Sequence, residues 1–217
     1  MDIVLRPTRR GEYRATEELV REAFWNLLAP GCVEHYLLHR LRGDPAYLPG
    51  LDWVALAAGR PVGVIAYSQA LVTGADGVRR PVATFGPIGV LPDWQGQRVG
   101  SALIEATLPL AAELGYGGVV ITGDPDYYRR FGFRTGKAFG IRLRDGRYHA
   151  ALLARELRPG GLSGVAGRYC EAEAFSLSPG DAGLLAFERG FPLKERVEGT
   201  PSQRRFARSA ARYLPDD

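Results

Sequence analysis

The stretch from residue 85 to residue 114 constrains the fold of this chain most, because it predicts a strand, a glycine-containing loop and a helix in direct succession. Residues 82–91 are rich in β-branched and apolar side chains, as strands are. Pro92 cannot donate to a sheet ladder, so this strand should end there. After the loop, from Gln97 onward, apolar residues recur at helical spacing. They are Val99, Leu103, Ala106, Leu110 and Leu114.

The first turn of such a helix is suited to binding an anion. Its backbone N–H groups lack intrahelical partners, and the aligned peptide dipoles add partial positive charge. Gly96 and Gly100 would let a bulky phosphate approach the backbone, and Arg98 adds a cation. A strand–loop–helix whose glycines serve packing alone has the same spacing. The chain has neither G-x-x-x-x-G-K-[ST] nor G-x-G-x-x-G after a strand, so neither a P-loop nor a Rossmann site is expected.

Residues 90–103 resemble the acetyl-CoA motif of the GNAT superfamily of N-acetyltransferases. That motif is a strand ending in V-x-P, followed by [QR]-x-x-G-x-[GA] and a helix. Gln95 matches the first loop position and Gly100 the last, whereas Arg98 stands where the family usually has its first glycine. Because the family's site uses mainly main-chain N–H groups, Arg98 can still donate one if its φ angle is negative.

A second resemblance follows downstream. Residues 117–122 read as a buried strand, and residues 123–133 resemble the family's second motif, a short helix that carries a tyrosine and ends in Gly-Phe. Tyr128 lies four residues before Gly132, which is the spacing of the family's general-acid tyrosine. The alternative is that Tyr128 is a core aromatic residue; of the adjacent pair, Tyr127 is the one expected to pack. With two motifs in this order, the chain is identified as a member of the GNAT superfamily.

The resemblance implies an α/β (α+β) GNAT fold, with a central, mixed, mostly antiparallel sheet that is splayed between the two motif strands and flanked by helices. The gap between those strands admits the pantetheine arm of acetyl-CoA, and the loop holds its diphosphate. Main-chain N–H groups near Val90 would polarise the thioester carbonyl. The residues expected to bind acetyl-CoA are Ile88, Gly89, Val90, Gln95, Gly96, Gln97, Arg98, Val99, Gly100 and Ser101.

The rest of the chain supplies the other elements. A strand is predicted at 3–7, helices at 11–28 and 33–41, and a hairpin of strands at 53–57 and 62–72, which forms a meander with the motif strand. The resemblance implies that the two helices wall the acceptor pocket. Pro87 favours a bulge, an edge or an end in the motif strand, and Pro109 should kink or end the motif helix.

The C-terminal part is less regular. The run 150–157 fits a strand or a helix equally, and 167–175 is a candidate for the last strand. The resemblance spans about residues 2–175, so we expect a GNAT domain at 1–175 and a C-terminal extension at 176–217 packed on it. Four arginines lie in the last part of this extension, and they favour either a polyanion site or an amphipathic helix docked by Phe206 and Tyr213. The formal net charge of +4 is small, so nucleic acid is not expected.

Composition excludes several classes of protein. No apolar run reaches the roughly 18 residues that span a bilayer, and no membrane association is expected. Cys32 and Cys170 have no metal-binding spacing, and His35 and His39 lack the glutamate of a zinc motif, so no metal is expected. Reduced thiols favour a cytoplasmic protein.

The predicted reaction is direct transfer of an acetyl group from acetyl-CoA to a primary amine of a small molecule or peptide. A lysine-like ammonium has a pKa of about 10.4, so a general base should help to make it neutral. The motif strand contains no carboxylate, and a water relay stays open beside five candidate side chains. These are Glu34, His35, Asp126, Glu171 and Glu173. The alternative function is a non-catalytic CoA-binding sensor or partner module. The acceptor and a homodimeric state are left open.

Overall fold

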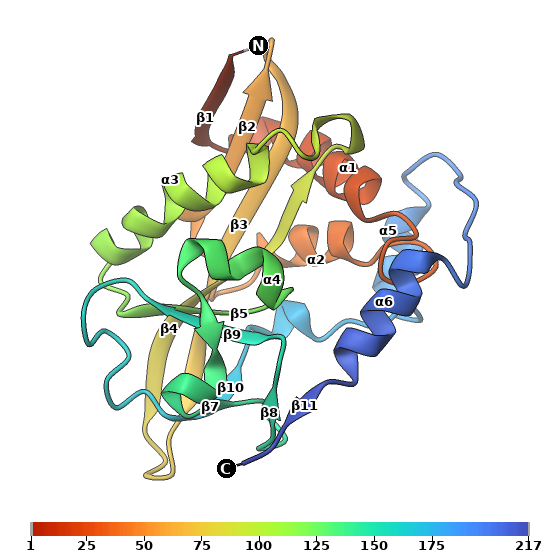
Figure 1. The fold of residues 1–217 in the computed structure, drawn as a ribbon. Helices are drawn as coiled ribbons and strands as arrows, with labels where there is room; N and C mark the ends of the chain where they lie inside the picture. Colours follow the sequence, from red (N-terminus) through yellow and green to blue (C-terminus); the bar gives the residue numbers. More distant parts are fainter. Residues whose placement is uncertain (1, 217) are drawn as a thin grey trace.

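A nine-stranded sheet runs through the computed structural model, which describes residues 2–216, and helices cover both faces of the sheet (Figure 1). Its strands are β1 (Ile3–Pro7), β2 (Trp53–Ala57), β3 (Arg60–Thr73), β4 (Arg79–Val90), β5 (Gly118–Thr122), β6 (Arg134–Thr135), β7 (Ile141–Arg142), β9 (Leu152–Glu156) and β10 (Gly167–Cys170). The separate pair β8 (Tyr148–His149) and β11 (Tyr213–Leu214) ties the end of the described chain to its middle.

The helices alternate with these strands. The α-helices are α1 (Tyr13–Phe24), α2 (Glu34–Leu41), α3 (Val99–Glu113), α4 (Pro125–Tyr128), α5 (Ala182–Glu188) and α6 (Pro201–Ala210). Short 3₁₀ helices are η1 (Arg10–Glu12), η2 (Pro49–Leu51), η3 (Pro92–Trp94), η4 (Arg129–Phe131), η5 (Gly136–Phe139) and η6 (Glu173–Phe175). Within the described residues, no helix is both long enough and apolar enough to cross a membrane.

The sheet is mixed and mostly antiparallel, as the sequence predicts. Its main path runs β1-β2-β3-β4-β5-β9-β6, and β10 pairs with β3 and β7. The two parallel pairings are β4 with β5 and β7 with β10. The remaining pairs of this sheet are antiparallel, and the long β3–β4 hairpin is the most extensive of them.

The two motif strands separate almost as soon as they meet. β4 and β5 pair only at Ala83 with Val119, and β4 then continues to Val90. The register of β4 against β3 also shifts there, so that Gly86 and Pro87 lie opposite Ala66 alone. The bulge expected at Pro87 is therefore confirmed, and so is the splayed sheet.

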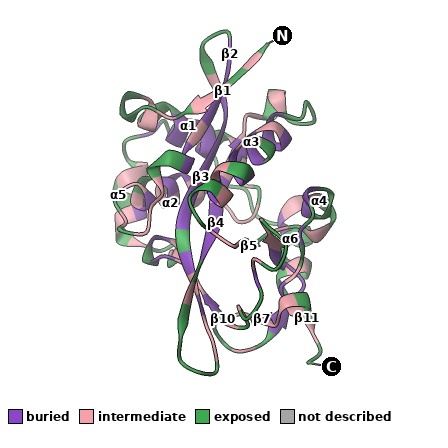
Figure 2. Cartoon of the chain, turned by 90° about the vertical axis from the view of Figure 1, so that its left-hand side faces the viewer, coloured by how far each residue is buried: buried purple, intermediate pink, exposed green. Residues whose placement is uncertain are grey.

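Alternate residues of β3 enter two different cores. Ile65 and Tyr67 pack with α3 on one face, whereas Val64 and Ala66 pack with α1 and α2 on the other. This follows from the two-residue period of side-chain direction in a strand. Figure 1 shows α3 on one side of the sheet and α1 and α2 on the other, and Figure 2 shows buried residues along the central strands.

Helices α1 and α3 are both shorter than predicted, because a residue near one end of each has a left-handed backbone conformation. α1 ends at Phe24 rather than near residue 28, and Asn26 adopts φ 57. α3 begins at Val99 rather than at residue 97, because Arg98 adopts φ 64. Both φ angles lie in the left-handed region, which cannot continue a right-handed helix.

Pro109 is expected either to kink the motif helix or to end its first half, and the second of these does not occur. α3 runs through Pro109 to Glu113. A proline leaves the carbonyl four residues earlier, here that of Glu105, without its helical donor. Pro109 and Glu105 are both exposed, so water can solvate that carbonyl and the helix continues.

The structure also shows what two less regular segments of the sequence form. The run around residues 150–157 forms strand β9 rather than a helix, and it pairs with β5. The predicted last strand at 167–175 is too long, because β10 ends at Cys170 and the chain turns into η6.

The segment after residue 175 packs against α1 and α2 through polar contacts. Arg21 of α1 pairs with Glu188 of α5, and Trp25 Nε1 donates to the Glu195 carbonyl at 2.8 Å. Gln203 of α6 is buried and donates to the carbonyls of Asn26 and Val197 at 3.1 and 2.9 Å.

Helix α6 is therefore anchored by Gln203, not by the aromatic residues that the sequence suggested. The prediction is wrong for Phe206, whose residue surface is 45% exposed. Tyr213 is also exposed, although it pairs in β11 and packs edge-on against His149 with ring centroids 5.0 Å apart. The sequence predicts an amphipathic helix here, but the buried side of α6 is polar rather than aromatic.

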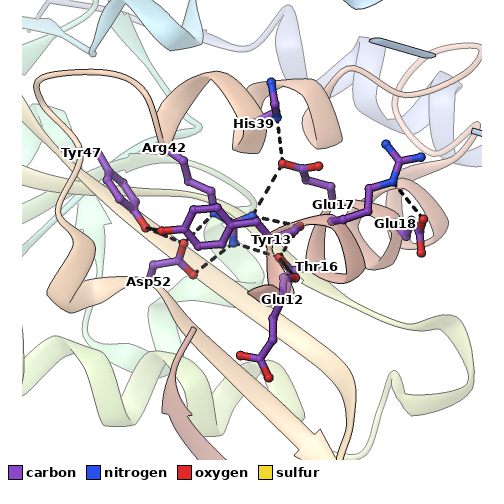
Figure 3. Close-up of polar contacts among 10 residues, drawn as sticks. Glu12, Tyr13, Thr16, Glu17, Glu18, His39, Arg42, Tyr47 and Asp52 are labelled. Atoms are coloured by element: carbon purple, nitrogen blue, oxygen red, sulfur yellow. Dashed lines mark hydrogen bonds and ion pairs between the residues drawn. The ribbon is translucent and has the colours of Figure 1, made fainter. Parts of the chain in front are cut away.

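A buried polar network fixes α1 and α2 to the start of β2 (Figure 3). The side chain of Arg42 is 3% exposed, and its Nε donates to Asp52 Oδ2 at 2.9 Å. Arg42 also donates to the Tyr13 carbonyl at 3.1 Å and to Thr16 Oγ1 at 2.9 Å. Tyr47 Oη donates to Asp52 at 2.7 Å. Removing one member would thus leave other buried polar groups without partners.

We predict that Arg42→Ala destabilises the fold by about 3–5 kcal/mol, because the Asp52 carboxylate would stay buried without its cation. Urea denaturation measures this loss as a lower midpoint at constant slope. The matched control is Arg80→Ala, which removes the more exposed ion pair with Asp76 and should cost far less. Equal losses in the two variants would contradict the structural role assigned to the network.

Candidate active site

The loop between β4 and α3 is shaped by two left-handed residues. Gly96 has φ 75 and Arg98 has φ 64. The expectation that Arg98 could keep a negative φ is therefore wrong, and the position has the conformation that favours glycine. The side chain of Arg98 points into solvent, 81% exposed, with Nη2 3.7 Å from Glu105 Oε1.

The start of α3 leaves backbone donors unused. The first N–H within the helix that reaches an intrahelical carbonyl is that of Ala102, which donates to Arg98 at 2.9 Å. The N–H groups of Val99, Gly100 and Ser101 precede it and have no such partner within the helix. This helix end therefore carries both free donors and the positive end of the helix dipole.

A cavity of about 340 Å³ lies at this helix end. The loop and the first turn of α3 form one side of it, and Tyr127 and Arg130 form the other. No carboxylate is among its lining residues. They are Val90, Trp94, Gln95, Gly96, Arg98, Val99, Gly100, Ser101, Tyr127 and Arg130.

A second cavity of about 210 Å³ adjoins the first. It extends along the end of β4 to the end of α1, and it too has no carboxylate in its lining. Val90, Gln95, Gly100 and Tyr127 line both cavities, so the two adjoin at these residues. The second is lined by Ala23, Phe24, Leu27, Ile88, Gly89, Val90, Gln95, Gly100, Tyr127 and Tyr128.

The structure brings nine of the ten residues predicted for acetyl-CoA together around these cavities, and Gln97 is the exception. Its amide donates to the Asp93 carbonyl at 2.7 Å and so closes the loop on itself. Gln95 does line both cavities, and its amide donates to the Val90 carbonyl at 3.1 Å, which fixes the loop to the end of β4.

Several lining residues were missed by sequence reasoning. Tyr127 packs against the core as expected, and its hydroxyl also lies 3.2 Å from the position a Cβ would take at Gly100. Arg130 stacks on the Tyr127 ring with its guanidinium carbon 4.5 Å from the centroid. The i, i+3 spacing of this pair on a short helical segment could have revealed it. Nothing in the sequence marks Phe24 and Leu27 as cavity residues.

Tyr128 both packs and lines the second cavity. Its ring lies 5.8 Å from that of Phe85 and 5.7 Å from that of Phe133. Burial raises the pKa of the Tyr128 phenol above its usual range. The hydroxyl therefore stays protonated at neutral pH and can act as a hydrogen-bond or proton donor.

The candidate bases occupy very different environments. Glu34 accepts from the Val33 N–H at 3.0 Å and from Cys32 Sγ at 3.2 Å. His35 is fully buried with Nε2 2.7 Å from Glu188 Oε2, and burial lowers the pKa of His35 to about 4. Neither side chain lines the two cavities.

Two other candidates, Asp126 and Glu173, are exposed. Glu171 also lines neither cavity, and it lies beside the buried Tyr169 hydroxyl. In the part of the chain that the structure describes, no group of three or more His, Cys, Asp or Glu side chains could hold a metal ion.

Comparison with known proteins gives a consistent result. Residues 51–135 match the family model of the acetyltransferase (GNAT) domain. The uncharacterized N-acetyltransferase YhbS of Escherichia coli strain K12 is 33% identical over 135 residues, which cover 62% of this chain and 78% of YhbS.

Solved structures agree with the sequence comparison. The crystal structure of E. coli YhbS in complex with CoA matches with a TM-score of 0.71 at 27% identity, over 81% of this chain and 92% of that one. A GNAT family acetyltransferase from Brucella melitensis in complex with acetyl-CoA matches with a TM-score of 0.65 at 26% identity, over 81% and 99%.

Proposed function

Because the chain belongs to the GNAT superfamily of N-acetyltransferases, we propose that it transfers an acetyl group from acetyl-CoA to a primary amine of a small molecule or peptide. The observation that carries this proposal is the double cavity that joins the start of α3 to the free edge of β4. Such a depression suits a long ligand with an anionic end and an amide-containing arm.

The diphosphate of acetyl-CoA would bind at the start of α3. The N–H groups of Val99, Gly100 and Ser101 are unused within the helix and lie at the positive end of its dipole. Arg98 and Arg130 line the same cavity and add positive charge. No carboxylate in the cavity lining opposes an anion there.

The pantetheine arm would lie along β4. β5 pairs with β4 at Ala83 alone, so the edge of β4 from Ile88 to Val90 has no strand beside it on that side in the described chain. Backbone groups on a free edge can hydrogen-bond to the amides of a ligand, as they would to another strand. The residues predicted for this role line the second cavity.

Tyr128 would protonate the departing CoA thiolate or stabilise it by hydrogen bonding. Its phenol lies at the second cavity, and burial raises its pKa, so the hydroxyl keeps its proton and can donate it toward the leaving sulfur. Backbone N–H groups near Val90 would polarise the thioester carbonyl. The competing interpretation is that Tyr128 serves packing alone. In that case, removing its hydroxyl would leave turnover unchanged.

A second candidate function is a CoA-binding module without turnover. The observation that favours it is that neither cavity is lined by a carboxylate or a histidine. Turnover separates the two, because a sensor would bind acetyl-CoA and release no thiol when amines are supplied. For location we propose the cytoplasm, since Cys32 and Cys170 are both free thiols.

We predict that Gly100→Trp weakens acetyl-CoA binding by about 100-fold or more, equivalent to about 2.7 kcal/mol. A Cβ at this position already meets Tyr127 Oη at 3.2 Å, and an indole would fill the shared part of both cavities. Calorimetric titration with acetyl-CoA measures the loss. Gly11→Trp is the control, because a Cβ there meets nothing within 4 Å. Intact binding by a folded Gly100→Trp variant would refute the placement.

We predict that Tyr128→Phe lowers kcat by about 10- to 10⁴-fold while the Kd for acetyl-CoA changes little. Free-thiol release would be followed with a panel of free amino acids, spermidine, an aminoglycoside and a tripeptide with a free N-terminus. Tyr116→Phe is the control, since its hydroxyl donates to Gln69 Oε1 outside both cavities. Wild-type turnover in Tyr128→Phe would remove this residue from the mechanism.

A further inference from the structure

The Tyr169 hydroxyl lies at the point where β4 and β5 separate. It is 2.9 Å from Thr84 Oγ1 and 3.2 Å from the Val120 carbonyl oxygen. Thr84 and Val120 each directly follow the single paired position of their strands, Ala83 with Val119. Tyr169 reaches this point from β10, across β3, where it pairs with Val72.

Glu171 lies beside this hydroxyl. Its Oε1 is 3.4 Å from Tyr169 Oη, and burial raises the pKa of the carboxyl above its ordinary value. Among the described residues it forms no ion pair, and the titratable groups near it are the Tyr169 phenol and the Cys170 thiol, whose Sγ lies 3.8 Å from the Glu171 carbonyl oxygen. The carboxylate is thus uncompensated, and its charge is available to another cation.

Glu171 and Tyr128 approach the separated strands from opposite faces of the sheet. Tyr128 packs on Phe85 in the core beneath α3. Tyr169 packs with Val82 and Val120 on the other face, and the chain after Glu171 joins the core of α1 and α2. The alternation of side chains along β4 accounts for this division.

We propose that Glu171 is the general base of the acetyl transfer, and that Tyr169 positions its carboxylate at the separation of β4 and β5. The inference rests on the proposed function, because it assumes that an acceptor amine meets the thioester there. The acceptor would enter from the α1–α2 face, opposite the face on which Tyr128 lies. A carboxylate without an ion-pair partner suits an acceptor that arrives as an ammonium ion.

Glu171 and Tyr128 accept and donate the protons that move in the proposed reaction. The Glu171 carboxylate removes one proton from the ammonium, and the nitrogen lone pair forms a C–N bond with the thioester carbon. The C–S bond breaks, the sulfur leaves with its electron pair and takes the proton of Tyr128. The second proton of the amine then returns to the Tyr128 phenolate, and Glu171 releases its proton to water.

The other candidates lack this placement. Glu34 accepts hydrogen bonds from its own helix start, and His35 lies buried behind Glu188. Asp126 and Glu173 are exposed on the surface of the protein. A base is more effective as its pKa approaches the working pH, and burial shifts Glu171 in that direction.

The first test is Glu171→Gln, assayed with whichever amine of the panel the wild type acetylates best. We expect kcat/KM to fall by about 10²- to 10⁴-fold and the Kd for acetyl-CoA to stay unchanged. The rate of the wild type should fall as the pH drops through the raised pKa of Glu171. This dependence on pH should be absent in the variant. Glu173→Gln, two residues further and exposed, is the matched control and should retain the wild-type profile.

An acceptor that is already neutral at pH 7, such as aniline, separates a base from a merely structural residue. The defect of Glu171→Gln should be small with aniline and large with the ammonium acceptor. Tyr169→Phe gives an independent readout, because its hydrogen bond favours the charged carboxylate. Losing that bond should move the acid limb of the pH profile to higher pH.

Three outcomes would overturn the inference. They are wild-type kcat/KM in Glu171→Gln, equal defects with aniline and the ammonium acceptor, and an unmoved acid limb in Tyr169→Phe. If the wild type binds acetyl-CoA but acetylates no amine of the panel, the proposed function fails first, and the role of Glu171 fails with it.

Discussion

The separation of β4 from β5 after a single paired position is the constraint on which the site depends. Backbone N–H and C=O groups that lose a strand partner must find another one, because leaving them buried and unpaired costs about 1–3 kcal/mol each. The Tyr169 hydroxyl contacts one of them, the Val120 carbonyl. The edge of β4 that faces the cavities is left for a ligand. The bulge at Gly86 and Pro87 keeps β4 paired with β3 while it diverges. One local irregularity therefore leaves an edge of β4 free and brings the Tyr169 hydroxyl to the point of separation.

The sequence predicts the part of the fold that is encoded locally. The strand, loop and helix around Gly96 and Gly100 are legible because proline, glycine and apolar spacing act within a few residues. The same rules missed the left-handed backbone of Arg98, since nothing in an arginine side chain signals that conformation. The effect of Pro109 could not be predicted either. The energetic cost of a proline inside a helix depends on whether the unpaired carbonyl is exposed to water, and residue spacing does not reveal exposure.

The surroundings of the five candidate bases depend on contacts between residues distant in the chain, so sequence reasoning could not rank these candidates. Glu171 and Glu173 look alike in the sequence, but β10 ends between Tyr169 and Glu171 so that one carboxylate turns inward and the other outward. Likewise, the buried side of α6 is marked by Gln203, a residue type that ordinarily predicts a surface position.

The last forty or so residues also act on the interior of the enzyme. Phe24 and Leu27 line the second cavity, and the turn that carries them is held by hydrogen bonds to Glu195, Val197 and Gln203. The catalytic motifs lie elsewhere, so this tail can vary without disturbing them. A substitution in this peripheral segment would therefore change the shape of the second cavity without replacing any residue that lines it.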